Sequence, residues 1–144
     1  MLINRNLSLE ELENSAWPEP ELPSSLIKKC HQLRKMPIGE LQTEDLRLLI
    51  GQNIGLPYIM PLAIELLFDN PLCAGAFFNG DLLQNVLNAD ISVWQKNSEL
   101  FEELILVMDD LECSMELYQN RLKPLWVKLT NDRICAVKGG NNTT

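Results

Sequence analysis

Few side chains in this sequence could take part in chemistry. The chain has one histidine, His31, and it directly follows Cys30. Within a helix, consecutive residues point roughly 100° apart, so these two side chains would not pair as nucleophile and base. The adjacent carboxylates Asp109 and Asp110 fall on a solvated helix face, whereas acid–base catalysis favours an apolar cleft that shifts the pKa. These patterns predict a protein that is not an enzyme, with His31 as a surface or capping side chain.

Metal and cofactor motifs are also weak. The four cysteines, Cys30, Cys73, Cys113 and Cys135, lie too far apart in the sequence for a zinc motif. We expect them to be structural thiols, and we expect no metal and no cofactor. Gly51 and Gly55 lack the flanking lysine and serine of a phosphate-binding loop. The sequence therefore favours a protein that works by binding.

Charge limits the class of partner. Twenty acidic residues face 12 basic ones in 144 residues, which gives a formal net charge of −8. Because phosphate contacts need lysine and arginine, a nucleic-acid partner is not expected, whereas an acidic protein attracts basic partners. The plainer alternative is that the acidity only keeps the protein soluble. Net repulsion mildly favours a monomer.

Two further patterns concern location. Glu65 interrupts the longest apolar run, so no membrane span is predicted and no membrane partner is expected. The first six residues do not combine a basic region with an apolar segment, as a secretory signal would. We therefore expect a cytoplasmic protein.

Helix signals run through the chain. Ser8 and Glu11 form a capping box, Ser24 or Ser25 precedes a second helical pattern, and Thr43 precedes a third. Three prolines after Trp17 predict a loop. Further helices are expected to start at Pro61 and Asp81, with a short turn around 93–94, and Ser98 is expected to cap the longest helix.

The predicted fold is all-α, with about six to eight helices in a single compact domain over residues 1–138 and a disordered tail over 139–144. Residues 125–129 are ambiguous. They fit a last helical turn, or a short extended segment that pairs with 134–137, and we favour the helix.

The long helix from Ser98 divides into two sides when residues are placed 100° apart. The apolar side carries Leu100, Phe101, Leu104, Met108, Leu111, Met115 and Tyr118. The acidic side carries carboxylates around a narrow apolar strip of Leu106, Cys113 and Leu117. An apolar centre with a charged border is typical of an interface, although a covering helix would explain the strip equally well. Trp126 and Arg121 are of residue types that often anchor interfaces, and burial in the core is the alternative for Trp126.

The most specific text in the chain is the segment 50–67, an apolar stretch broken by two glycines and two prolines. This segment resembles the bacterial contact-dependent growth inhibition (CDI) immunity proteins. The resemblance also includes the segments 9–13, 17–20, 30–35, 43–47, 70–72 and 80–83 and Trp94. The resemblance covers roughly residues 9–105, and the segment beyond about Leu106 is particular to this chain.

The resemblance implies an antitoxin that binds and neutralises the C-terminal toxin domain of a CDI effector. It further implies that the toxin is a basic protein, commonly a nuclease and often a ribonuclease, whose active-site cleft the acidic antitoxin would occlude as a 1:1 heterodimer. The resembling residues look like scaffold. This structural signature consists of Trp17, Gly51, Gln52, Asn53, Gly55, Pro57 and Pro61.

Specificity for one toxin belongs on variable surface residues. The predicted toxin-binding residues are Glu99, Glu102, Glu103, Leu106, Asp109, Asp110 and Glu116. An alternative contact face is the helix with Glu10, Glu11 and Glu13 together with the Trp17 loop. A second hypothesis is a helical regulatory adaptor for an endogenous basic protein, which genomic context would separate from an antitoxin. We expect His31→Ala to have no effect on either function.

Overall fold

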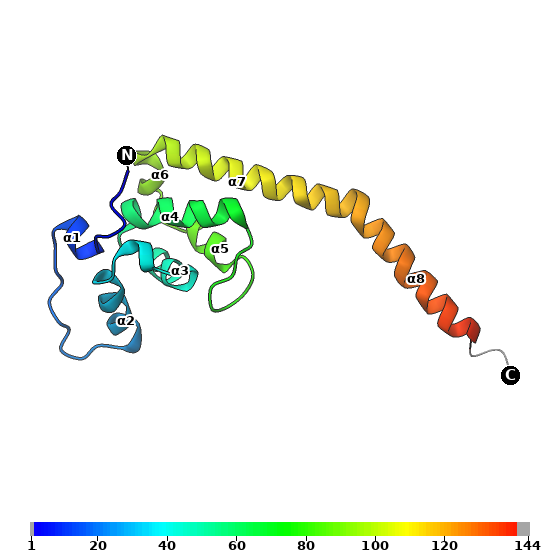
Figure 1. Ribbon diagram of the computed structural model, residues 1–144, viewed down its shortest axis with the longest axis horizontal. Helices are drawn as coiled ribbons and strands as arrows, with labels where there is room; N and C mark the ends of the chain where they lie inside the picture. Colours follow the sequence, from blue (N-terminus) through cyan, green and yellow to red (C-terminus); the bar gives the residue numbers. More distant parts are fainter. Residues whose placement is uncertain (1, 141–144) are drawn as a thin grey trace. The chain divides into compact units, whose positions relative to one another are not determined.

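The structure is a computed structural model that describes residues 2–140 and divides into two compact units, Met1–Val107 and Met108–Thr144 (Figure 1). All regular elements in this range are helices, which confirms the predicted all-α class and helix number. The α-helices are α1 Leu9–Glu13, α2 Ser25–Arg34, α3 Thr43–Gly51, α4 Leu56–Asp69, α5 Asp81–Leu87, α6 Ser92–Lys96, α7 Ser98–Leu117 and α8 Lys123–Gly140. A 3-10 turn, η1, spans Ile38–Glu40, and a π-turn, η2, spans Tyr118–Leu122.

Polar side chains define where the helices begin. Ser8 accepts from the N–H of Glu11, and the Glu11 carboxylate accepts from the N–H of Ser8, as the capping box predicts. Ser24 caps α2. Two caps lie one residue earlier than expected: Gln42 precedes α3, and Asn97 accepts from the N–H of Leu100 at the start of α7.

The turn between α3 and α4 depends on two left-handed residues, Asn53 with φ 55° and Gly55 with φ 63°. A Cβ on Gly55 would lie 2.7 Å from a methyl group of Leu9, so glycine is needed both for its conformation and for space. Since α4 begins directly after Gly55, Pro57 falls in its first turn. The prediction that Pro61 starts this helix is wrong, because Pro61 lies inside α4.

The core of the first unit forms around α3 and α4. Helix α3 packs against α2, α4 and α5, and α4 also packs against α5. The central side chains are almost fully buried and apolar, and they include Leu33, Leu49, Ile59, Met60, Leu67, Leu82 and Val86. Within this unit, Leu100, Leu104 and Val107 are buried, so one side of the first part of α7 completes the core.

The second unit contains the rest of α7, the π-turn and α8. The N–H of Lys123 bonds to the carbonyl of Tyr118, which is the wide hydrogen bond of a π-turn, and Pro124 follows at once. Proline and π-turns are the usual causes of a bend, and the helix axis within this unit changes direction here (Figure 1). Residues 125–129 and 134–137 lie in α8, so the alternative of an extended C-terminal segment is wrong and the favoured helix is confirmed.

The predicted domain limits stay a prediction. Helix α8 continues through Gly140, two residues into the segment expected to be a tail. Residues 141–144 of that segment lie outside the described part of the chain.

Candidate functional site

The predicted contact residues of the first unit lie on the solvent side of α7. Glu99, Glu102, Glu103 and Leu106 are all exposed, with Leu106 at 59%. Their spacing of three and four residues places them near one another on the helix surface. None of the ion pairs found within residues 2–140 involves these three glutamates. Their negative charge is therefore available to a partner.

The other predicted contact residues belong to the second unit. Asp109, Asp110 and Glu116 are exposed, and the hydroxyl of Ser114 donates to the backbone carbonyl of Asp110. Among the described residues, none of the ion pairs involves these three carboxylates.

An apolar pocket lies on the first unit, and the sequence did not predict it. Its volume is about 490 Å³, and its lining is Leu87, Ala89, Ile91, Trp94, Gln95, Phe101 and Leu104. The rings of Trp94 and Phe101 lie 6.1 Å apart between centroids, tilted by 58°. Phe101 was expected on the buried side of α7, but it is 44% exposed because it forms the edge of this pocket.

The loop 74–80 before α5 is held by two carboxylates. Asp81 is 3% exposed, and its carboxylate accepts from the N–H groups of Gly75 at 2.6 Å and of Phe77 at 3.0 Å. Burial alone would raise the pKa of Asp81, but the backbone N–H donors outweigh it and hold the pKa below its usual value. Glu44 accepts from the N–H of Ala76 at 2.7 Å.

Arg47 completes this clamp on the loop. It donates twice to Glu44, at 2.6 Å each, and these hydrogen bonds are the main reason that the pKa of Glu44 is lowered. Its guanidinium also lies 4.4 Å from the centre of the Phe77 ring. Phe77 is nonetheless 70% exposed, and Phe78 54%. The clamp therefore presents two aromatic side chains to solvent on a loop held by hydrogen bonds.

The alternative contact face on α1 is already committed to internal contacts. Glu13 pairs with the buried Arg34 at 3.3 Å, Glu10 lies 4.0 Å from the same guanidinium, and Glu11 serves the capping box. Arg34 also donates to the carbonyl of Ser15 and stacks 4.1 Å from the Trp17 ring centre. These contacts fix the loop after α1 to α2.

The signature residues around the turn have structural contacts. Gly51 ends α3 where a Cβ would lie 2.8 Å from the amide nitrogen of Asn85, and Gln52 is the residue that closes this helix. The side chain of Asn53 accepts from the N–H of Asp90 at 3.2 Å. Pro57 and Pro61 line a smaller pocket near the start of α7.

His31 lies against the loop that follows α1. Its ring packs edge-on against Trp17 with centroids 5.4 Å apart. All four cysteines are free thiols, and burial raises the pKa of Cys30 and Cys73, which disfavours the reactive thiolate. No group of three or more metal-binding side chains occurs among residues 2–140. None of the helices in this range is long and apolar enough to cross a membrane.

Comparison with known protein families gives a match over most of the first unit. A family model described as CDI immunity proteins matches residues 11–104, about two thirds of the chain. No curated protein and no solved structure matches significantly.

Proposed function

Because the chain belongs to the family of CDI immunity proteins, we propose that it is a cytoplasmic antitoxin for the toxin domain of its own CDI effector. One chain binds one toxin domain and occludes its active-site cleft, without catalysis and without a cofactor. The toxin is a basic nuclease, of the ribonuclease type. The family match supports toxin binding, and the free carboxylates of α7 support a basic partner.

The contact face in the first unit consists of Glu99, Glu102, Glu103 and Leu106. A nuclease must present positive charge to the phosphates of its substrate, and these carboxylates follow the same charge pattern as a phosphate backbone. They are better placed for this than the carboxylates of α1, which already serve Arg34 and the capping box. In the second unit, the proposed toxin contacts are Asp109, Asp110 and Glu116.

We expect the apolar pocket to slow dissociation of the toxin, which charge alone does not do. Charge speeds encounter, whereas slow dissociation depends on a few apolar side chains that become fully desolvated. The pocket lined by Trp94 and Phe101 is open to receive an apolar side chain of the toxin. Phe77 and Phe78 on the clamped loop are a second pair of exposed aromatic anchors.

The test is protection of cells that produce the toxin domain encoded beside this chain. We expect the wild-type chain to restore growth and to co-purify with the toxin. The triple variant Glu99→Lys, Glu102→Lys, Glu103→Lys should lose most protection, because each change replaces attraction by repulsion.

The matched control is Glu21→Lys, Glu40→Lys, Asp69→Lys, which changes the same charge at three exposed sites outside α7. This control should protect nearly as well as the wild type. Equal loss in both triple variants would remove the α7 face from the proposal, and failure of the wild-type chain to bind the toxin would refute the function itself.

A further inference from the structure

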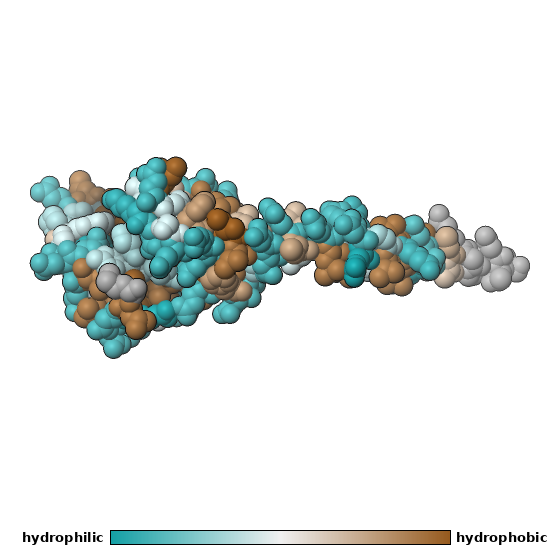
Figure 2. Space-filling model, turned by 90° about the horizontal axis from the view of Figure 1, so that it is seen from above, coloured by the Kyte–Doolittle hydropathy of each residue, from teal (hydrophilic) through white to brown (hydrophobic). Residues whose placement is uncertain are grey.

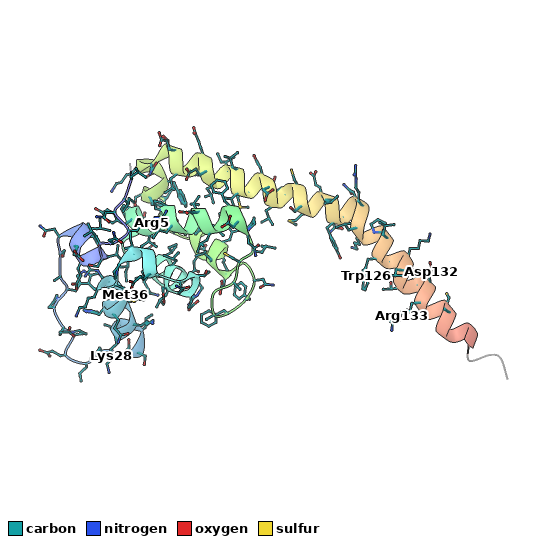
Figure 3. The ribbon with its side chains drawn as sticks, viewed as in Figure 1. Arg5, Lys28, Met36, Trp126, Asp132 and Arg133 are labelled. Carbon is teal, nitrogen blue, oxygen red and sulfur yellow. The ribbon has the colours of Figure 1, made fainter. Side chains whose placement is uncertain are left out.

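Most apolar side chains of the second unit are exposed, whereas Met108 and Leu111 are half-buried. The large apolar residues of its π-turn and α8 are at least 44% exposed where their side chains are described, and Leu125 and Trp126 reach 66% and 60%. Figure 2 shows hydrophobic residues at the surface of this segment, and Figure 3 labels Trp126, Asp132 and Arg133 on α8. Isolated helices are marginal in water, so a helix of this composition gains stability by packing against a partner.

The spacing of these residues indicates what kind of partner fits. Apolar side chains recur at alternating intervals of three and four residues, which is the pattern of a coiled-coil seam. The seam residues are Met108, Leu111, Met115, Tyr118, Leu122, Leu125 and Leu129. They cover three heptads, and a seam of this kind is completed by another helix with the same pattern.

Charge in the second unit is divided between its two ends. Residues 108–117 contain four acidic and no basic residues, whereas residues 118–136 contain four basic residues and one acidic residue. The unit as a whole is neutral, with five residues of each sign. A second copy in the antiparallel direction would place each acidic end beside a basic end, and a parallel copy would place like charges together.

We propose that the second unit is a dimerisation element that pairs antiparallel with the second unit of another copy of this chain. With the two-fold axis through the π-turn, Tyr118 faces Leu122 of the other copy. Met115 then faces Leu125, and Leu111 faces Leu129. The pairing is self-complementary, as a two-fold interface requires.

This arrangement leaves the proposed toxin contacts free. Asp109, Asp110 and Glu116 occupy heptad positions that point away from the seam, whereas Glu112 and Arg133 flank it on the same side. The monomer expected from the net charge of −8 does not apply to this segment, since all of that net charge belongs to residues 1–107. A basic toxin is a poorer occupant of this surface, because α8 is itself basic.

The experiment measures the mass of the full chain in solution by light scattering after size-exclusion chromatography. A particle of about twice 16.4 kDa in the absence of toxin is expected. A monomer at about 100 µM, a concentration at which a specific dimer should form, would overturn the proposal.

Two single variants locate the interface. Leu122→Asp should convert the dimer to a monomer, because it places a charge at the centre of the seam. Val127→Asp is the matched control, since Val127 is an exposed apolar residue of the same helix that lies off the seam, and it should leave the dimer intact. Both residues are exposed and lie outside the core of the first unit, so urea unfolding of that core should be the same in both variants. Equal mass for the two variants, whether dimer or monomer, would contradict the proposed seam.

A charge exchange tests the direction of the pairing. Glu112→Arg and Arg133→Glu should each weaken the dimer at least several-fold, and the two together should restore it. Absence of rescue would exclude the antiparallel register. Two other occupants are also tested: if the seam variants keep their mass but lose binding to the toxin domain or to anionic lipid vesicles, the surface serves that partner and the dimer is refuted.

Discussion

Asp81 shows how one buried carboxylate can organise a surface. It lies at the start of α5, as the sequence predicts. Its carboxylate oxygens accept hydrogen bonds from backbone N–H groups of the loop that carries Phe77 and Phe78. The sequence did not reveal this second role, because it depends on a loop folding back toward its own helix start. The contacts of Glu44 and Arg47 with the loop could not be predicted either, because about thirty residues separate them from it in the sequence.

The lowered pKa of Asp81 predicts how the loop responds to acid. A carboxyl whose pKa is lower in the folded state stabilises that state at pH values above its unfolded pKa, about 3.9, and loses this contribution as the pH falls through the folded pKa. We expect the protection of the Gly75 and Phe77 amides against hydrogen exchange, measured relative to the intrinsic exchange rate at each pH, to fall as the pH drops below about 4. Asp81→Asn should lower this protection already at pH 7, whereas Asp69→Asn, at an exposed site, should behave as the wild type. Exchange in Asp81→Asn that matches the wild type would contradict the clamp.

Gly55 gives a second prediction at this scale. Gly55→Ala forces a Cβ into a left-handed conformation and against Leu9, and each effect costs on the order of 1 kcal/mol or more. Urea unfolding should show a free energy of unfolding lower by about 2 kcal/mol. Gln52→Ala, at an exposed position of the same turn, should change it by less than about 0.5 kcal/mol. The glycines and prolines of this segment predicted the turn correctly, although Pro57 and not Pro61 lies in the first turn of α4.

The first part of helix α7 has two functions on two sides. Leu100, Leu104 and Val107 complete the core, whereas Glu99, Glu102 and Glu103 face solvent. The 3.6-residue period predicted this division well. It did not predict that Phe101 would border an open pocket, because a period gives the side of a helix but not how far its neighbours extend.

Two leucines on opposite sides of α7 separate stability from binding. Leu104→Ala should lower the free energy of unfolding by about 2–5 kcal/mol, because Leu104 is buried. Leu106→Ala should change it by less than about 0.5 kcal/mol but should weaken toxin binding. Urea unfolding and binding titrations on the same two variants check this. A large loss of stability in Leu106→Ala, with binding unchanged, would assign Leu106 to the core instead.

At the scale of the whole molecule, charge is distributed unevenly along the chain. Residues 1–107 contain fifteen acidic and seven basic residues, whereas the rest of the chain is neutral. The helical class and the family resemblance were readable from the sequence. The exposure of the apolar residues in the second unit could not be predicted from the sequence. A helix has the same apolar pattern whether that side packs within its own chain or against a partner.

The uneven charge predicts a salt-dependent encounter with the toxin. The association rate should fall at least tenfold between about 0.02 and 0.5 M salt, because the steering field is screened within a shorter distance. The dissociation rate should change much less, since apolar anchors govern it. Stopped-flow mixing at several salt concentrations measures both rates. An association rate that does not depend on salt would argue against electrostatic steering.

The decisive measurement is a titration of the purified chain against the catalytic activity of its cognate toxin domain. We expect activity to disappear at one chain per toxin domain, and the Glu99→Lys, Glu102→Lys, Glu103→Lys variant to need a large excess to reach the same inhibition. A toxin that stays fully active while the chain is bound, or that both proteins inhibit equally, would contradict this expectation.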